Sequence, residues 1–186
     1  MSRFSRDSTP LVGLTCLTRQ FPGDSRGYFA RLFCKNDLAP YLNGRILEQI
    51  NFSFTAGRGV VRGLHFQYPP HAEMKIVSCL RGEIWDVAVD LRADSPTFLQ
   101  WHAETLSAAN GKSLLIPEGF AHGFQTLSNE VEMHYCHTAA YEPEAEGAIH
   151  PEDGSLAISW PLPITSMSDR DKSHPHLDNT FTGIRL

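Results

Sequence analysis

Three residues that could carry acid–base chemistry lie close together between Gly59 and Arg92, in a stretch otherwise typical of β-strands. They are Arg62, His65 and Lys75. Because an imidazole titrates near neutral pH, His65 could remove a proton from a carbon acid. That reaction needs a cation or hydrogen-bond donor at the developing oxyanion, and Lys75 could supply it.

Inversion of a carbon centre also requires an acid on the face opposite to the base. Tyr135 is a suitable donor, because an unperturbed phenol titrates near pH ~10. Taken singly, Lys75 could equally be a solvated strand-edge lysine and Tyr135 a half-buried structural tyrosine. The combination of base, cation and acid is what indicates chemistry.

His65 and His122 stand in distinctive frames, RGLHFQ and PEGFAHGF. The spacing P-x-G-x-x-H in the second frame resembles a conserved block of the cupin superfamily, whose small β-barrels often hold a metal. Metal-binding cupins carry a second histidine two residues after the first, and here that position is Gln67. A metal needs about three converging ligands. We therefore expect no metal cofactor, and the alternative is a site of His65, His122 and a distant carboxylate.

The elements that must position these residues are expected to be short strands. Apolar and polar residues alternate along 83–91, so one face is mainly apolar and the other carries Asp86 and Asp90. Arg81-Gly82 before them predicts a hairpin turn, because glycine tolerates a positive φ. Many short strands predict an all-β sandwich or barrel, with a jelly roll as the natural candidate. The other expected strands are 11–21, 28–33, 47–54, 98–106, 113–116 and 131–139, and one short helix is expected at 36–42.

One of these strands is expected to present polar side chains to an inner surface. Gln49, Asn51 and Ser53 share one face of the strand that precedes the central stretch, which indicates that an inner surface is wet. In the strand 131–139, Met133, Tyr135 and His137 share one face, and His134, Cys136 and Thr138 share the other.

The chain has 186 residues, 41% of them hydrophobic, which suffices for one domain with a substantial core. We expect a flexible N-terminus at 1–10 and a single domain at 11–186. A net charge of −5 argues against a nucleic-acid or anionic-membrane binder. Without an apolar signal core or an apolar run of ~20 residues, neither export nor membrane spanning is expected. Four scattered cysteines indicate reduced thiols in a cytoplasmic protein.

A series of motifs occurs in a fixed order along the chain. It comprises DSRGYF, QIN, RGLHFQ, MK, GEIWDVAVDLR with DSPTF, PEGFAHGF, the pair Tyr135 and Tyr141, and SDRD. This ordered set strongly resembles the deoxythymidine-diphosphate (dTDP)-4-dehydrorhamnose 3,5-epimerase family of nucleotide-sugar epimerases. The resemblance extends from about Gly13 to Leu177, and it is specific as a set although each motif alone would be weak.

The resemblance implies a cupin-type jelly roll with a few short helices, assembled as a homodimer and acting on a nucleotide-sugar substrate without metal or organic cofactor. It implies that His65 is the base, that Asp171 orients it and that Tyr135 is the acid. It places Lys75 near the C4 carbonyl oxygen of the sugar. The substrate contacts that it implies are Arg26, Gln49, Asn51, Arg62, His122, Glu146 and Arg170.

Two residues depart from the family pattern. Arg31 stands where a glutamate is common, at a position that contacts the nucleotide, so the nucleotide stays open between dTDP and another. Arg170 replaces a lysine, which keeps the charge and changes its geometry. Because arginine forks bind phosphate oxygens in pairs, a cluster of Arg26, Arg62 and Lys75 suits a diphosphate ligand.

The sequence therefore predicts an epimerase that inverts C5, C3 or both in a nucleoside-diphosphate 4-keto-6-deoxyhexose, in deoxysugar biosynthesis. The alternatives are a mono-epimerase or keto-isomerase on another nucleotide sugar, and a sugar-nucleotide-binding cupin without activity. A metal-dependent oxygenase is disfavoured by Gln67. The tail after Ser168 is expected to cover the barrel mouth, because Asp171 has to reach His65.

Overall fold

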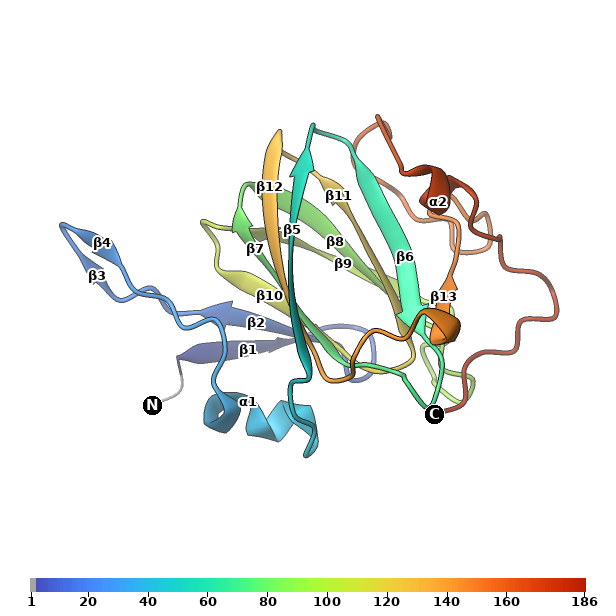
Figure 1. Ribbon diagram of the computed structural model, residues 1–186, viewed down its shortest axis with the longest axis horizontal. Helices are drawn as coiled ribbons and strands as arrows, with labels where there is room; N and C mark the ends of the chain where they lie inside the picture. Colours follow the sequence, from blue (N-terminus) through green and yellow to red (C-terminus); the bar gives the residue numbers. More distant parts are fainter. Residues whose placement is uncertain (1–2) are drawn as a thin grey trace.

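Two antiparallel β-sheets face one another in the computed structural model, which describes residues 3–186 (Figure 1). The six-stranded sheet has the order β1-β2-β10-β7-β12-β5, and the five-stranded sheet has the order β13-β6-β11-β8-β9. The strands of the first sheet are β1 (Phe4–Ser8), β2 (Thr15–Arg19), β10 (Lys112–Ile116), β7 (Lys75–Arg81), β12 (Glu130–His137) and β5 (Gln49–Ala56). Those of the second are β13 (Glu146–Ala148), β6 (Val61–Gln67), β11 (Phe120–Thr126), β8 (Glu83–Asp90) and β9 (Trp101–Ser107).

The remaining elements are short and lie outside the two sheets. A small hairpin of β3 (Gly23–Asp24) and β4 (Gly27–Tyr28) projects from the barrel, at the left of Figure 1. Helix α1 spans Lys35–Leu42, the 3₁₀ helix η1 spans Pro143–Ala145, and helix α2 spans Asp169–Lys172. No helix among the described residues is long and apolar enough to span a membrane.

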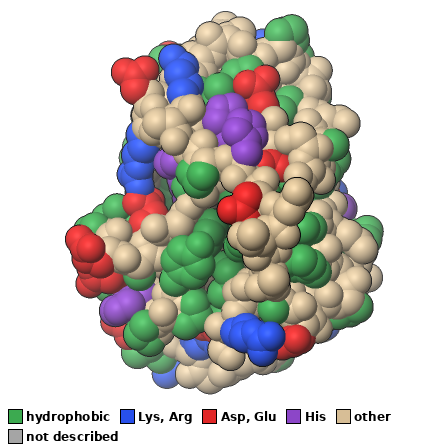
Figure 2. All heavy atoms as spheres, turned by 90° about the vertical axis from the view of Figure 1, so that its right-hand side faces the viewer, with side chains coloured by type: hydrophobic (Ala, Val, Ile, Leu, Met, Phe, Trp, Pro, Cys, Tyr) green, Lys and Arg blue, Asp and Glu red, His purple; other side chains and the backbone are tan. Residues whose placement is uncertain are grey.

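The hydrophobic core has three parts, because both sheets are covered on both faces. Side chains such as Val77, Phe124 and Met133 fill the space between the sheets. Leu38 and other residues of α1 cover the outer face of the six-stranded sheet. The segment after β13 covers the outer face of the five-stranded sheet, and Figure 2 shows this side, where histidine and acidic side chains lie among hydrophobic ones. Because apolar clusters on both outer faces also stabilise the sheets, part of the space between the sheets can be lined by polar side chains.

The turn at Gly82 differs from the hairpin that the sequence predicted. Gly82 does have a positive φ of 76°, and a Cβ there would lie 2.4 Å from the carbonyl oxygen of Glu130. However, β7 pairs with β10 and β12, whereas β8 pairs with β9 and β11. The turn therefore carries the chain from one sheet to the other, which is how a jelly roll closes.

The N-terminal end also differs from the expected flexible segment at 1–10. Phe4–Ser8 pairs along its whole length with β2 as the edge strand of the six-stranded sheet, while residues 1–2 lie outside the described part. Helix α1 begins at Lys35 with Cys34 as its N-cap, which makes no side-chain capping bond, rather than with Asn36 as the cap. Local composition did not show the strand β1, because its pairing with β2 is a contact between separate segments of the chain.

Candidate active site

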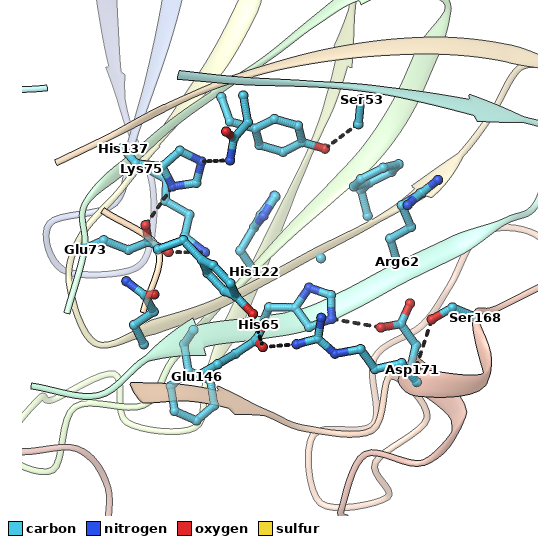
Figure 3. A pocket seen from close by; sticks show the side chains of 18 of the residues that line it. Ser53, Arg62, His65, Glu73, Lys75, His122, His137, Glu146, Ser168 and Asp171 are labelled. Atoms are coloured by element: carbon cyan, nitrogen blue, oxygen red, sulfur yellow. Dashed lines mark hydrogen bonds and ion pairs between the residues drawn. The ribbon is translucent and has the colours of Figure 1, made fainter. Parts of the chain in front are cut away.

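A cavity of about 450 Å³ opens between the two sheets and collects most of the residues singled out in the sequence. β5, β7 and β12 line it from one sheet, and β6 and β11 line it from the other; α2 closes one side (Figure 3). Its polar lining comprises Asn51, Ser53, Arg62, His65, Gln67, Glu73, Lys75, His122, Tyr135, His137, Tyr141, Glu146, Ser168, Arg170 and Asp171.

A close approach of two glycines brings two histidines opposite one another. Gly63 in β6 has a φ of 130°, and a Cβ there would lie 2.6 Å from the Cα of Gly123 in β11. The two strands therefore touch where no side chain intervenes, and the register of β11 shifts at the same place. As a result, His65 and His122 are paired across the strands, and both line the cavity.

His65 is hydrogen-bonded to Asp171, with 2.8 Å between Nε2 and Oδ1 (Figure 3). Helix α2 carries Asp171, and the hydroxyl of its N-cap Ser168 accepts a hydrogen bond from the backbone N–H of Asp171 at 3.0 Å. Burial opposes ionisation of this carboxyl, but the hydrogen bond and charge of His65 outweigh burial and lower the pKa of Asp171. An ionised carboxylate only accepts, so Nε2 of His65 carries the proton and Nδ1 keeps a lone pair.

His122 forms a second histidine–carboxylate pair, with 2.7 Å between its Nε2 and Oδ1 of Asp86. Asp86 is fully buried in β8, and among the described residues its Oδ2 has no hydrogen-bond partner. Burial raises the pKa of Asp86, and the proximity of His122 offsets this only in part. Both members of this pair lie in strands of one sheet, whereas the carboxylate of the His65 pair lies in the short helix α2.

Tyr135 lies on the opposite sheet, and its hydroxyl is 3.0 Å from the hydroxyl of Ser53 (Figure 3). Burial raises the pKa of Tyr135 to about 12. The phenol is therefore protonated at neutral pH and can donate a proton. Its ring lies 6.4 Å from the imidazole of His122 and 6.2 Å from that of His137, between centroids.

Lys75 shares the carboxylate of Glu73 with His137. Lys75 Nζ lies 2.9 Å from one oxygen of Glu73, and His137 Nδ1 lies 2.7 Å from the other. Although burial opposes ionisation, the hydrogen bond from His137 and the charge of Lys75 lower the pKa of Glu73. On its other side, Nε2 of His137 lies 3.4 Å from the side-chain amide of Asn51, which accepts a bond from Gln49 at 3.0 Å.

Polar residues at the mouth of the cavity are held by one another. The hydroxyl of Tyr141 donates to Glu146 at 2.9 Å, and Arg170 is hydrogen-bonded to the same carboxylate oxygen. Arg62 donates to the hydroxyl of Thr55 at 2.9 Å. The cavity lining therefore includes two guanidinium groups, those of Arg62 and Arg170.

Comparison with known families decides what this arrangement is. The family model described as dTDP-4-dehydrorhamnose 3,5-epimerase matches residues 8–179. The chain belongs to this family. The fold and the enzyme class that the sequence predicted, a jelly roll and a carbohydrate isomerase, are confirmed at that level.

Individual relatives of this epimerase agree with the assignment. A dTDP-4-dehydrorhamnose 3,5-epimerase of Salmonella typhimurium is 41% identical over 160 residues, covering 86% of this chain and 87% of that protein. A dTDP-4-dehydrorhamnose 3-epimerase of Streptomyces niveus is 36% identical, covering 87% and 78%. The crystal structure of a dTDP-6-deoxy-D-glucose-3,5-epimerase from Legionella pneumophila in complex with dTDP-4-keto-L-rhamnose superposes with a TM-score of 0.91 at 37% identity, covering 98% of each chain.

Three predicted substrate contacts of this epimerase, Arg26, Arg31 and Gln49, do not line the cavity of the same chain. Arg26 lies in the β3–β4 hairpin, where it pairs with Asp24 at 2.6 Å and its side chain is 88% exposed. Arg31 pairs with Asp37 of α1 at 3.1 Å. Arg26 lies outside the cavity because the hairpin projects from the barrel (Figure 1), and Arg31 lies in the segment between that hairpin and α1.

The cavity also contains polar residues to which the sequence analysis gave no role. His137 did carry a signal, since strand alternation placed it on the same face as Tyr135; Asp86, which binds His122 but does not itself line the cavity, was also placed on a defined face. Glu73 carried none, because it precedes β7 in a segment without periodicity. Its importance follows only from the approach of His137 and Lys75 from neighbouring strands.

Proposed function

We propose that this chain inverts C5, and C3 as well, of a dTDP-linked 4-keto-6-deoxyhexose by acid–base chemistry through an enolate. The observation that carries the proposal is the His65–Asp171 pair on one wall of the cavity, with Tyr135 and Lys75 lining the same cavity from the other sheet. A base and an acid on opposite walls are what inversion of a carbon centre requires. The Legionella relative was solved with dTDP-4-keto-L-rhamnose, which supports a dTDP-sugar substrate.

In the first step, Nδ1 of His65 takes the proton from the carbon next to the C4 ketone. The electron pair of the broken C–H bond moves into the enolate, so that negative charge develops on the C4 oxygen. Asp171 keeps the tautomer that leaves Nδ1 free and stabilises the imidazolium that forms. Lys75 faces the cavity and stabilises the enolate oxygen, and Glu73 and His137 fix its position.

In the second step, Tyr135 donates its phenolic proton to the opposite face of the same carbon. Its raised pKa keeps the proton on the phenol until the enolate forms. The resulting phenolate accepts a hydrogen bond from Ser53, which lies at 3.0 Å. Exchange of protons with solvent then restores both His65 and Tyr135.

We also propose that the functional unit is a homodimer in which Arg26 reaches the cavity of the second copy. β5 is an edge strand, and its outward Ile50, Phe52 and Phe54 are 60%, 61% and 48% exposed. A second copy of the chain would cover this apolar edge. The projecting hairpin would then deliver Arg26 to a diphosphate that Arg62 and Arg170 already face.

Mixed dimers test this arrangement directly. Arg26→Ala and His65→Ala chains are each expected to lose most activity alone. If they are unfolded and refolded together, dimers with one chain of each kind contain one cavity with an intact His65 and the intact Arg26 of the other chain. Activity should therefore return on mixing. A monomer in sedimentation velocity, or no recovery in confirmed mixed dimers, would contradict the proposal.

The site of the reaction is proposed to be the cytoplasm. All four cysteines are free, and Cys16, Cys79 and Cys136 are buried. Free buried thiols are typical of proteins that fold in a reducing compartment. Location of the protein by fractionation of cells checks this proposal, and recovery from an exported fraction would contradict it.

The decisive experiment is exchange of carbon-bound protons in deuterated water. Purified protein is incubated with dTDP-4-keto-6-deoxyglucose, and NMR follows C3 and C5. Deuterium at both positions with inversion establishes the double epimerase, and deuterium at one position makes it a mono-epimerase, as the name of the Streptomyces niveus relative describes. Binding without exchange would leave two explanations. The substrate could be a different nucleotide sugar, selected by the charge of Arg31, or the protein could bind the sugar nucleotide without catalysis.

The same assay separates the two proposed roles. His65→Ala should lower the rate of exchange by about 10²–10⁴ or more. Tyr135→Phe should still exchange the proton on the face of His65 but return deuterium with retention, because the acid on the other face is missing. If Tyr135→Phe still inverts the centre at the wild-type rate, another group is the acid.

A further inference from the structure

A third side chain with metal-binding chemistry lies beside the His65–Asp171 pair. His174 follows α2, and its Nε2 lies 3.2 Å from Oδ1 of Asp171, the oxygen that also accepts the hydrogen bond from His65. The rings of His65 and His174 pack edge to face with centroids 5.3 Å apart. Within residues 3–186, these three form the one cluster of histidine, cysteine or carboxylate ligands whose donor atoms all lie within 4.8 Å.

His174 is not satisfied in this position. Its side chain is only 10% exposed, yet its Nε2 makes no hydrogen bond of acceptable geometry to any residue that the structure describes. A buried polar nitrogen without a partner costs free energy, so such atoms are uncommon unless something else binds there. The nitrogen is aimed at the carboxylate that holds the proposed base.

We propose that His65, Asp171 and His174 bind a divalent transition-metal ion, Zn²⁺ in type, and that this ion competes with catalysis. Two imidazoles and one carboxylate suit Zn²⁺ and related ions rather than Mg²⁺ or Ca²⁺. Bonds of about 2.0–2.1 Å place tetrahedral ligands about 3.3 Å apart. The present separations of 2.8 and 3.2 Å need only a small spreading, and α2 is a surface helix of four residues that can supply it.

Inhibition follows from the tautomer of His65 and rests on its proposed role as base. Nε2 now donates its proton to Asp171, and Nδ1 holds the lone pair. A metal ion that binds Nε2 needs a lone pair there and therefore displaces the Nε2 proton. The single proton of the neutral ring then has to lie on Nδ1. His65 then has no lone pair for the substrate proton. The ion therefore blocks the base without filling the sugar site.

Metal binding is measured first, without reference to activity. Untagged full-length protein, treated with chelator and then freed of it, is titrated with Co²⁺, whose visible d–d absorption reports coordination by protein ligands, and the bound ion is then displaced with Zn²⁺. One ion per chain is expected. His174→Ala should weaken binding by about 100-fold or more, since even loss of an indirect partner costs about 10–100-fold.

A matched control comes from the same tail. His176 stacks on His150 and lies 3.5 Å from Asp153, but it belongs to no three-ligand cluster among the described residues. His176→Ala should bind Co²⁺ as the wild type does. His174→Gln keeps the size and polarity of the side chain and should also lose the ion. No Co²⁺ absorption in the wild type, or equal binding by folded His174 variants, would overturn the proposal.

The activity arm then tests the competition. Zn²⁺ should abolish deuterium exchange in the wild type over the same concentration range in which it displaces Co²⁺, and chelator should restore it. Binding of Zn²⁺ with unchanged exchange would refute inhibition through His65. If the protein proves to have no exchange activity, the Co²⁺ titration still decides whether the metal site exists.

Discussion

Two histidines face the same cavity from paired positions on adjacent strands, each hydrogen-bonded to a carboxylate, and the two pairs differ in where the carboxylate comes from. His65 and Asp171 are 2.8 Å apart, and His122 and Asp86 are 2.7 Å apart. Asp171 arrives on a short surface helix, whereas Asp86 is part of a central strand and fully buried. The pKa of Asp171 is lowered, but burial raises that of Asp86.

The difference shows that a hydrogen-bonded pair does not define a catalytic unit by itself. An ionised carboxylate fixes the tautomer of its histidine and stabilises the cation that forms when the histidine accepts a proton. A carboxyl that resists ionisation gives little such support, and it serves to hold an imidazole in place. We therefore assign proton abstraction to the His65 pair and positioning to the His122 pair.

The largest effect should separate the two histidines. His65→Ala is expected to lower the rate of deuterium exchange by at least about 10²–10⁴, because a positioned base is lost. Substrate affinity, measured by isothermal titration calorimetry, should change far less. His122→Ala is expected to weaken binding and to leave a larger share of the exchange rate. If His122→Ala is the more damaging to exchange, the two pairs have been assigned in the wrong order.

Asp171→Asn should come next, with a loss of about 10²-fold in exchange. The amide is nearly the same size but cannot stabilise the imidazolium, and it can favour the wrong tautomer. Because the pKa of Asp171 is lowered, the wild-type carboxylate stays ionised throughout the neutral range, so titration of Asp171 itself adds no pH dependence to this loss between pH 6 and 8. A variant that matches the wild type across this range would show that Asp171 does not act on His65.

Asp86→Asn should change stability more than activity. Since burial raises the pKa of Asp86, the folded protein holds that proton more tightly than the unfolded chain, and wild-type stability falls as the pH rises above the ordinary range of an aspartate. Asn removes this penalty while its oxygen can still accept from His122. Urea unfolding should show a gain in stability at pH 7–8 that vanishes in acid. A less stable variant at pH 8 would mean that an ionised Asp86 stabilises the fold.

Ser168→Ala should give the smallest effect and tests the delivery of Asp171. The hydroxyl caps α2 by accepting from the backbone of Asp171, and loss of an N-cap costs about 0.5–2 kcal/mol. If that cost loosens α2 alone, exchange should fall a few-fold while global unfolding is unchanged. Amide hydrogen exchange in 169–173 should rise at the same time. No comparable variant exists for Asp86, whose backbone lies in a sheet.

The sequence predicted these features to different degrees, for physical reasons. The motifs around His65, Lys75 and Tyr135 fell in segments predicted as strands, and the structure brings all three side chains to one cavity. Contact between His65 and Asp171 was expected from the resemblance, since nothing local links residues 106 positions apart. The role of Glu73 and the change of sheet at Gly82 depend on strand pairing, which no single segment encodes.

The position of Asp171 beyond the last strand has a consequence for the order of folding. All the strands of the two sheets precede α2 in the chain, so none of their pairing depends on that helix. A state in which the sheets have paired and α2 has not docked would hold an imidazole without its carboxylate. On the proposed role of His65, closure of the barrel and completion of the base are therefore separable steps.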